Sequence, residues 1–310
     1  MKAIRFHQYG DSGVLRYEDA PKPQAGLDEL LIRVHSAGVN PADWQFRQGY
    51  YKDFAPRPLP FIPGWDVAGM VEAVGAQVTR FKPGDAVFAM ADMSRNGAYA
   101  EYIAVCADHV APAPRAIPLQ QAAAVPLAAL TAWSALFAHG ALAPGQSVLV
   151  HAGAGGVGLF AVQLAHHAGA RVLATASAAN HELLRRFGAD EVIDYRGDDL
   201  ALRATGMDLV IDTVGGEMRE QSWKLLRPGG LLAGVAMPPP DETQARAHGV
   251  RAAMIAVTPD GARLAEIGAL IDAGKLQVLI DSEYPLADAA AAQVRSQGRH
   301  ARGKIILRVG

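Results

Sequence analysis

The glycine-rich run from Ala152 to Gly158 is the part of this sequence whose residue types and spacing indicate chemistry most directly. Residues 147–152 form an apolar segment typical of a strand, and the apolar residues after the run recur at helical spacing. Glycines at such a junction permit a tight turn and let the backbone approach a pyrophosphate, whose charge the N–H groups at a helix start stabilise. This context predicts a dinucleotide-binding turn, and a tight turn without a ligand is the alternative. The residues expected to bind the cofactor here are Ala152, Gly155, Gly156, Val157 and Gly158.

The next predicted strand, residues 171–176, indicates which dinucleotide to expect. An NAD site usually has Asp or Glu at the end of this strand, where the carboxylate binds the 2′-hydroxyl group. No acidic residue occurs between Arg171 and His181, so nothing there would repel a 2′-phosphate. Ser177 and Asn180 can donate hydrogen bonds to that phosphate, or they can simply cap the helix that follows. The sequence therefore predicts NADPH as the cofactor.

The cysteine and histidine content limits what metal chemistry is possible. Cys106 is the only cysteine, which excludes an internal disulfide and a four-cysteine zinc site. His166 and His167 are adjacent on a predicted helix and point in different directions, which favours packing or surface roles. His151 precedes the glycine-rich run, and we expect it to make a structural hydrogen bond at the strand end.

The charge balance and the apolar pattern exclude other classes of partner. The net charge is −2 and no basic block stands out, so a small metabolite fits better than a nucleic acid. Residues 1–10 are typical of a strand rather than of a signal or transit peptide. No run of about eighteen apolar residues predicts a membrane span. Together with the single cysteine, which suits a reducing compartment, these features lead us to expect a cytoplasmic protein.

Two domains must position these residues. Residues 1–117 are rich in Gly and Pro and contain short β-like runs, which predicts a compact β-rich domain. The runs are residues 2–7, 30–35, 67–74, 86–90 and 99–105. Residues 259–310 add a helix at 261–273, a β-like run at 276–280, a helix at 287–294 and a strand at 304–309, and this tail is expected to complete the first domain.

Residues 118–258 alternate strands with helices after an opening helical segment at 120–136, which predicts an α/β fold with a doubly wound parallel sheet. The strands are expected at 147–152, 171–176, 191–194, 209–212, 231–236 and 252–257. Helices follow the first, second and fourth strands. The last of these, residues 217–226, is expected to end at the turn formed by residues 227–230.

An ordered set of motifs resembles the medium-chain dehydrogenase/reductase superfamily, in its zinc-lacking quinone oxidoreductase (zeta-crystallin-like) branch. The resemblance covers essentially the whole chain and implies a GroES-like β-rich catalytic domain, a Rossmann domain and a homodimer. Zinc enzymes of the superfamily hold their metal with Cys, His and Cys, whereas the matching positions here are Asn40, Trp65 and a residue near Leu127, which are not zinc ligands. The matching stretches are residues 37–43, 62–69, 81–85, 97–102, 152–158 and 188–190.

The resemblance also implies which residues line the acceptor site. Asn40 and Asp43 match positions near the acceptor, and the Asn40 amide can donate a hydrogen bond to a carbonyl. A capped turn with Asp43 as the N-cap is the alternative. Tyr50 lies in a loop that could reach the pocket and donate a proton, or it could pack at a domain edge. Asn40, Asp43 and Tyr50 are therefore the candidate catalytic residues.

Further family positions concern the cofactor. Thr131 matches a position close to the nicotinamide, and Tyr195 matches one near the 2′-phosphate. Many NADPH-dependent relatives carry Lys or Arg near position 180, where this chain has Asn180, and the nearest cations considered are Arg185 and Arg186 two helical turns further on. Lys304 either reaches the cofactor or is a solvated charge. Strand ends supply the remaining expected contacts, at Val214, Val235 and Ala236.

Hydride transfer without a metal favours particular acceptors. A conjugated acceptor delocalises the charge that develops on its oxygen, so it needs a Lewis acid less than a simple ketone does. The expected function is therefore an NADPH-dependent, zinc-independent reductase of quinones, enones or related conjugated carbonyls. An enoyl-thioester reductase and an NADPH-binding sensor or structural protein with little turnover are the alternatives.

Overall fold

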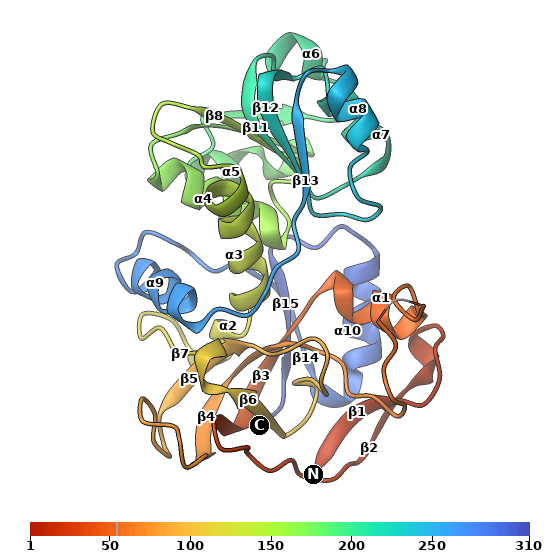
Figure 1. The fold of residues 1–310 in the computed structure, drawn as a ribbon, viewed down its shortest axis with the longest axis vertical. Helices are drawn as coiled ribbons and strands as arrows, with labels where there is room; N and C mark the ends of the chain where they lie inside the picture. Colours follow the sequence, from red (N-terminus) through yellow and green to blue (C-terminus); the bar gives the residue numbers. More distant parts are fainter. Residues whose placement is uncertain (54) are drawn as a thin grey trace. The chain divides into compact units, whose positions relative to one another are not determined.

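The alternating segments in the middle of the chain form a parallel sheet in the computed structural model, which describes residues 1–53 and 55–310 (Figure 1). The strands follow the order β10, β9, β8, β11, β12, β13, which is the order of a doubly wound dinucleotide fold. Val148, Leu149 and Val150 of the central strand β8 are fully buried, as expected for a strand covered on both faces. The predicted Rossmann sheet is thus confirmed. Its strands are β8 (Ser147–Val150), β9 (Arg171–Ala176), β10 (Glu191–Asp194), β11 (Met207–Asp212), β12 (Leu226–Gly234) and β13 (Arg251–Met254).

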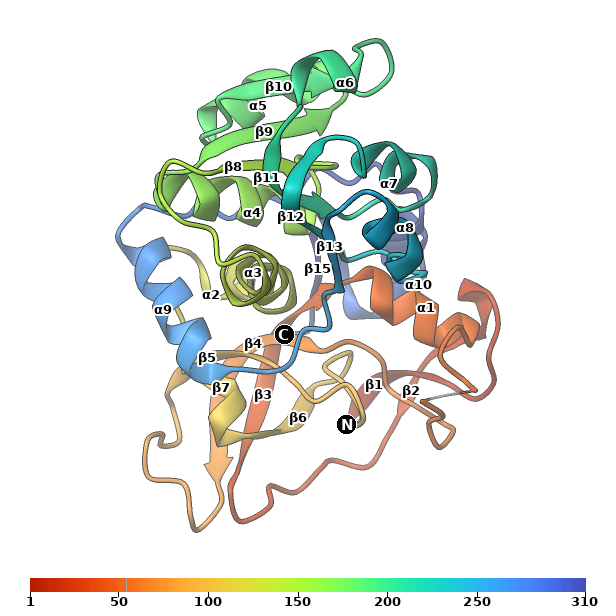
Figure 2. The same ribbon diagram turned by 45° about the horizontal axis from the view of Figure 1, so that its top comes forward.

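Helices connect these strands, and α4 packs beside β8 and β9 (Figure 2). Gly169, the residue after the C-cap Ala168 of α4, has φ +76°, a left-handed conformation that favours glycine at a helix end. Two short helices that the sequence did not predict, α6 and α8, begin where the carboxylates of Asp199 and Asp241 accept backbone N–H groups. The helices of this unit are α3 (Pro126–Trp133), a π-helical turn (Ser134–His139), α4 (Gly156–His167), α5 (His181–Arg186), α6 (Leu200–Arg203), α7 (Gly216–Ser222) and α8 (Glu242–Ala247). A 3₁₀ turn (Ala178–Asn180) precedes α5.

Two predicted segments are wrong. The helix expected at 217–226 ends at Ser222, and residues 227–230 form an irregular opening of β12, across which its register with β11 shifts. The β-like run expected at 276–280 is not a strand, because the side chain of Gln163 binds both the N–H and the carbonyl of Gln277, at 2.7 and 3.1 Å. These backbone groups are therefore not available to a sheet, and β14 begins only at Ile280.

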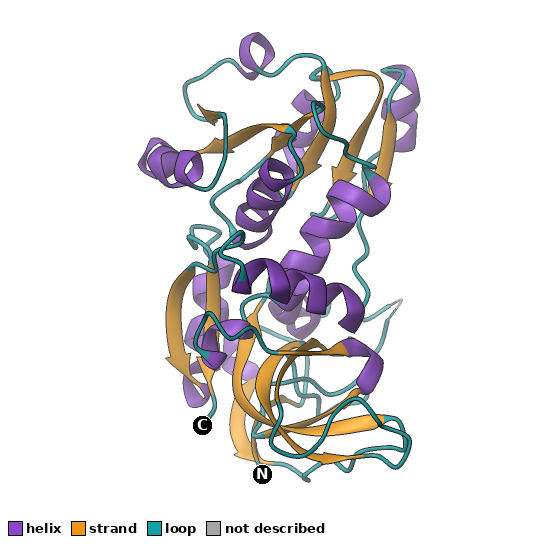
Figure 3. Ribbon diagram, turned by 90° about the vertical axis from the view of Figure 1, so that its left-hand side faces the viewer, coloured by secondary structure: helices purple, strands orange, loops and turns teal. Residues whose placement is uncertain are grey.

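A second sheet contains strands from both ends of the chain, and it lies near the two termini in Figure 3. Its main path runs β14, β15, β3, β4, β5, β7, and β6 pairs with β3, whereas β1 and β2 form a separate antiparallel pair. The strands are β1 (Lys2–Phe6), β2 (Leu15–Asp19), β3 (Glu29–Val39), β4 (Asp66–Val74), β5 (Ala86–Met90), β6 (Tyr102–Cys106), β7 (Val110–Pro112), β14 (Ile280–Pro285) and β15 (Lys304–Arg308). The helices are α1 (Pro41–Gln48), α2 (Leu119–Ala122), α9 (Gly261–Asp272) and α10 (Ala289–Gln297), with 3₁₀ turns at Ser12–Val14, Ala107–His109 and Leu286–Asp288.

Contacts divide the chain into two compact units. The first contains Met1–Leu127, Thr258–Gly274 and Val278–Gly310, and the second contains Ala128–Val257 with Lys275–Gln277. We propose that they correspond to the expected GroES-like and Rossmann domains. Among the described residues, no helix combines the length and apolar character that a membrane span requires.

A close backbone contact in the first unit, between residues 62–64 and 97–99, fixes the position of Tyr99. Gly97 N–H donates to Ile62 O at 2.7 Å, and Tyr99 N–H donates to Pro63 O at 3.1 Å. A Cβ atom at Gly97 would collide with the carbonyl of Gly64, so only glycine permits this approach. The contact fixes the backbone of Tyr99, whose ring is fully buried.

Candidate active site

The junction between β3 and α1 is a buried polar turn in the first unit. Asn40 is the N-cap of α1, with extended backbone angles, and Pro41 occupies the first helical position, which suits its fixed φ and its missing N–H. The Asp43 carboxylate accepts the Asn40 N–H at 2.7 Å. Asp43 therefore lies at the third helical position, and the alternative in which it was the N-cap is wrong.

Lys304 and Asp66 hold the side chain of Asn40 from two sides. The amide nitrogen of Asn40 donates to Asp66 Oδ2 at 2.8 Å, and the Lys304 ammonium donates to the amide oxygen. The same ammonium lies 3.4 Å from Asp66 Oδ2 and donates to Val39 O at 3.3 Å. Asn40 is 2 % exposed and Asp66 is fully buried, so this arrangement excludes water.

Lys304 is the clearest correction to the sequence analysis, because one of its two alternatives, a solvated charge, is wrong. The residue is 5 % exposed, because β15 pairs with β3 and sets Ile305 opposite Val39. That register brings a residue from the end of the chain next to Asn40. A lysine that opens the apolar run at 305–307 was the available signal, but sequence spacing alone does not show which strand it joins.

Asp66 links Asn40 to Leu127, which lie at or near positions that the family resemblance matches to zinc ligands. Its Oδ2 accepts from Asn40, and its Oδ1 accepts the Leu127 N–H at 2.7 Å. Trp65 is fully buried and packs edge-on against Phe46, with ring centroids 4.9 Å apart. No group of three or more His, Cys, Asp and Glu side chains suited to a metal ion occurs among the described residues.

Asp43 is a buried carboxyl group with an unusual proton affinity. The Tyr99 hydroxyl donates to its Oδ2 at 2.8 Å, whereas its buried Oδ1 has no partner among the described residues. Desolvation raises the pKa of Asp43 from 3.8 to about 7, and the hydrogen bonds from Asn40 and Tyr99 oppose this only in part. Burial, together with Asp43, also raises the pKa of Tyr99 well above its usual value, so its hydroxyl stays a donor.

Tyr50 is not brought to this cluster. Tyr50 follows α1 in the sequence and is 62 % exposed. Its ring lies edge-on to that of Trp44, with centroids 6.1 Å apart. The alternative expectation of edge packing describes this position better than the expectation of a buried proton donor. Its assignment as a catalytic residue therefore stays a prediction without a structural contact to Asn40 or Asp43.

The glycine-rich turn in the second unit has the geometry of a phosphate-binding turn. Ala152 has φ +50°, and Gly155 is the N-cap of α4. A Cβ atom at Gly158 would lie 2.5 Å from Ala152 O, so the turn can close this tightly only with glycine there. The first N–H groups of α4, from Gly156 onward, have no carbonyl partner within the helix. Gly156 and Val157 can therefore donate to a pyrophosphate, and these residues fit the dinucleotide that the sequence predicts.

His151 fixes the start of this turn through two hydrogen bonds. Its Nδ1 lies 3.1 Å from Thr175 Oγ1, and its Nε2 lies 2.9 Å from Ser222 Oγ. Thr175 Oγ1 also accepts the Ala152 N–H at 3.2 Å. Burial lowers the pKa of His151 to about 4, so the ring is neutral near pH 7. The expected structural hydrogen bond is confirmed.

The turn after β9 has a cation beside it that the sequence reasoning missed. Asn180 donates to Ser177 Oγ at 3.1 Å, and the Ala178 N–H donates to Asp194 Oδ2 at 3.2 Å. Arg196 binds the same carboxylate through Nε and Nη2, each at 3.2 Å, and lowers the pKa of Asp194 to about 2. Tyr195 is 46 % exposed next to it. Arg196 follows β10, the third strand of the sheet, so the residues at the end of β9 do not reveal it.

A buried ion pair joins the loops after β11 and β12. Arg219 Nε donates to Asp212 Oδ2 at 2.5 Å, and its Nη2 donates to Ala236 O at 2.5 Å. Asp212 Oδ1 accepts the Val214 N–H at 2.9 Å, and Asp212 O accepts the Val235 N–H at 2.8 Å. The pair thus fixes the three strand-end residues expected to contact the cofactor. Thr131 is 2 % exposed in α3, and its place near the nicotinamide stays a prediction.

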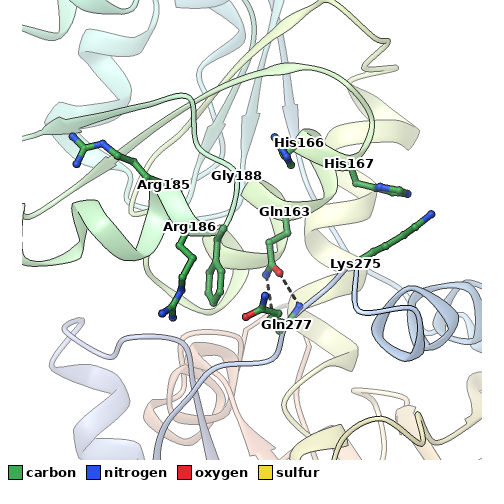
Figure 4. A pocket seen from close by; sticks show the side chains of 9 residues that line it. Gln163, His166, His167, Arg185, Arg186, Gly188, Lys275 and Gln277 are labelled. Atoms are coloured by element: carbon green, nitrogen blue, oxygen red, sulfur yellow. Dashed lines mark hydrogen bonds between the residues drawn. The ribbon is translucent and has the colours of Figure 1, made fainter.

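A separate pocket of about 330 Å³ in the second unit lies at the carboxyl ends of α4 and α5. Because α4 has 12 residues, this pocket and the glycine-rich turn lie about 18 Å apart along the helix. Figure 4 shows the side chains of Arg185, Arg186 and Lys275 pointing in different directions. They do not converge on a common point, so these three cations do not form a joint anion site in this pocket.

Comparison with known proteins gives consistent results over the whole chain. Residues 26–115 match the model of the alcohol dehydrogenase GroES-like domain, and residues 187–307 match a model described as zinc-binding dehydrogenase. The chain is 34 % identical to the quinone oxidoreductase of Mus musculus, over 99 % of this chain and 97 % of that protein. It is 36 % identical to the chloroplastic NADPH-dependent alkenal/one oxidoreductase of Arabidopsis thaliana, over 99 % of this chain and 79 % of that protein. The structure of Escherichia coli quinone oxidoreductase complexed with NADPH superimposes with a TM-score of 0.90 at 29 % identity, with both chains covered completely.

The raised pKa of Asp43 predicts a specific pH dependence of stability. The folded protein keeps a proton on Asp43 up to about pH 7, whereas the unfolded chain releases it near 3.8. The contribution of this group to stability is therefore complete below 3.8 and is lost as pH rises through 7. As pH rises from 3.8 to 7, we expect the free energy of unfolding to fall less in the Asp43→Asn variant than in the parent protein. Urea unfolding at several pH values measures both. Equal losses in the two proteins would show that Asp43 titrates normally.

Proposed function

Because the chain belongs to the quinone oxidoreductase branch of the medium-chain dehydrogenase/reductase superfamily, we propose that it reduces quinones, enones or related conjugated carbonyls with hydride from NADPH. The observation that carries this proposal is the buried set Asn40, Lys304 and Asp66, in which Asn40 matches, by family resemblance, a position where the zinc enzymes have a metal ligand. It offers an amide donor next to an ammonium group. Such a set can stabilise negative charge on a conjugated oxygen without a metal.

Different residues are proposed to bind the pyrophosphate of the cofactor and the acceptor. The N–H groups of the glycine-rich turn bind the pyrophosphate, and the strand-end loops held by Arg219 and Asp212 support the rest of the dinucleotide. When bound, NADPH supplies the hydride. The Asn40 amide donates to the carbonyl oxygen of the acceptor, where charge accumulates. Asp43 is proposed to line the acceptor site, and Thr131 is proposed to lie near the nicotinamide.

Zinc independence is supported by the side chains at the matching positions. The indole of Trp65 offers no ligand to zinc, and neither does the aliphatic side chain of Leu127, near the third matching position. The Asn40 amide is already engaged with Lys304 and Asp66. We also propose a cytoplasmic homodimer. This part rests on the family resemblance and on a single cysteine, which suits a reducing compartment.

Turnover of purified, EDTA-treated protein tests the function. We expect rapid oxidation of NADPH with an ortho-quinone or an enone, slower oxidation of NADH, and no recovery or gain on addition of zinc. Activity confined to simple alcohols, or activity lost with EDTA, would contradict the proposal. Tight NADPH binding without turnover on a broad acceptor panel would instead favour the sensor or structural alternative.

Arg196 is proposed to supply the positive charge that position 180 lacks. It is anchored through Asp194 to the turn that contains Ser177 and Asn180, so its guanidinium lies beside the expected 2′-phosphate site. We expect Arg196→Gln to raise the dissociation constant of NADPH roughly tenfold, because a hydrogen bond to a charged group is lost. The dissociation constant of NADH should change less than about twofold, because NADH has no 2′-phosphate that Arg196 could contact.

The control is Arg186→Gln, which removes an exposed arginine at the far end of α5 and should leave both dissociation constants unchanged. Fluorescence titration with each cofactor measures these constants. If Arg196→Gln weakens the binding of NADPH and of NADH equally, the turn is disturbed and the proposed contact to the 2′-phosphate is rejected.

A further inference from the structure

Lys304 is a buried charge whose location needs a physical reason. Its ammonium is 5 % exposed and its partner Asp66 is fully buried, so both groups have lost most of their hydration. Such pairs add little to stability on balance, and apolar residues of similar volume often stabilise a core as well or better. A tie between β15 and β3 does not require a charge either, since backbone hydrogen bonds already join these strands. The charged pair therefore points to a role beyond folding.

The chemistry of the two partners fixes the orientation of the Asn40 amide. An ammonium group only donates and an ionised carboxylate only accepts, so the amide oxygen must face Lys304 and the amide nitrogen must face Asp66. Rotation of the amide by half a turn would oppose donor to donor and acceptor to acceptor. The nitrogen has two hydrogens and gives one to Asp66. The second has no partner among the described residues and remains available to a ligand.

The ammonium group also changes the strength of that second donor. A hydrogen bond from a charged donor to the amide oxygen draws electron density from the amide, and linked hydrogen bonds in a dry interior polarise one another. The remaining N–H of Asn40 is therefore a better donor than it would be without Lys304, whose effect opposes that of the Asp66 carboxylate on the amide nitrogen. This gain matters most when the oxygen of the acceptor becomes negative, which is the condition for lowering a barrier rather than tightening ground-state binding.

We propose that Lys304 is a positioning residue for the reduction, which acts through Asn40 by orienting its amide and strengthening its free N–H toward the carbonyl oxygen of the acceptor. This role rests on the proposed function. It predicts an effect of Lys304 on turnover that exists only while the Asn40 amide is present. It also predicts that binding of NADPH does not depend on the Lys304 charge.

A double-mutant cycle tests this role. We expect Lys304→Met to lower kcat about tenfold or more, with the NADPH dissociation constant and the KM of the enone changed less than about twofold. In an Asn40→Ala background, the same Lys304→Met change should lower kcat less than about twofold further, because the amide through which it acts is gone. Arg308→Met is the matched control, since Arg308 lies on the same strand and is exposed, and its turnover should equal that of the parent protein.

The outcomes separate the two proposals. If Lys304→Met lowers kcat by the same factor in both backgrounds, or if the folded Lys304→Met protein keeps the parental kcat, the positioning role is overturned and the proposed function stands. A parent protein without turnover on any acceptor would overturn the proposed function and this role with it. If Lys304→Met does not fold, the pair Lys304→Met with Asp66→Asn removes both charges together. A folded pair variant with parental kcat would equally reject the role, and a tenfold loss would support it.

Discussion

The buried ion pair between Lys304 and Asp66 is the constraint that fixes how distant segments of the first unit meet at Asn40. A charge removed from water must be matched by partners at fixed positions, and here these come from distant parts of the sequence. Lys304 from β15, Asp66 from β4 and Asn40 from the start of α1 must meet, and Leu127 must present its N–H to the second oxygen of Asp66. These groups can meet because the C-terminal strand β15 pairs with β3, in the same sheet as β4.

The second unit obeys a similar rule with different groups. Neutral His151 ties the glycine-rich turn to Thr175 and Ser222, and the Asp212–Arg219 pair ties together the loops after β11 and β12. Each connection satisfies polar groups that would otherwise be unpaired in the interior. The backbone groups proposed to contact NADPH are thus held in place before the cofactor binds, which reduces the ordering cost of binding.

Periodicity and turn chemistry were sufficient to predict the Rossmann sheet, because apolar strands and the glycine-rich run are local features. The wrong strand at 276–280 shows the limit of that approach. Its residues suit a strand, but a distant glutamine, Gln163, occupies the backbone groups that a strand needs. Asn40 and Asp43 were found through family positions, whereas Lys304 and Arg196 gain their meaning only from strand pairing and from a turn contributed by another strand.

The central claim is that Asn40, held by Lys304 and Asp66, binds the oxygen on which charge develops. The most direct measurement is a crystal structure of the protein with NADP⁺ and an unreactive enone analogue. The account predicts that the carbonyl oxygen of the analogue accepts a hydrogen bond from Asn40 Nδ2 while Lys304 remains on Oδ1. An analogue bound beside the nicotinamide with its oxygen directed away from Asn40 would contradict it.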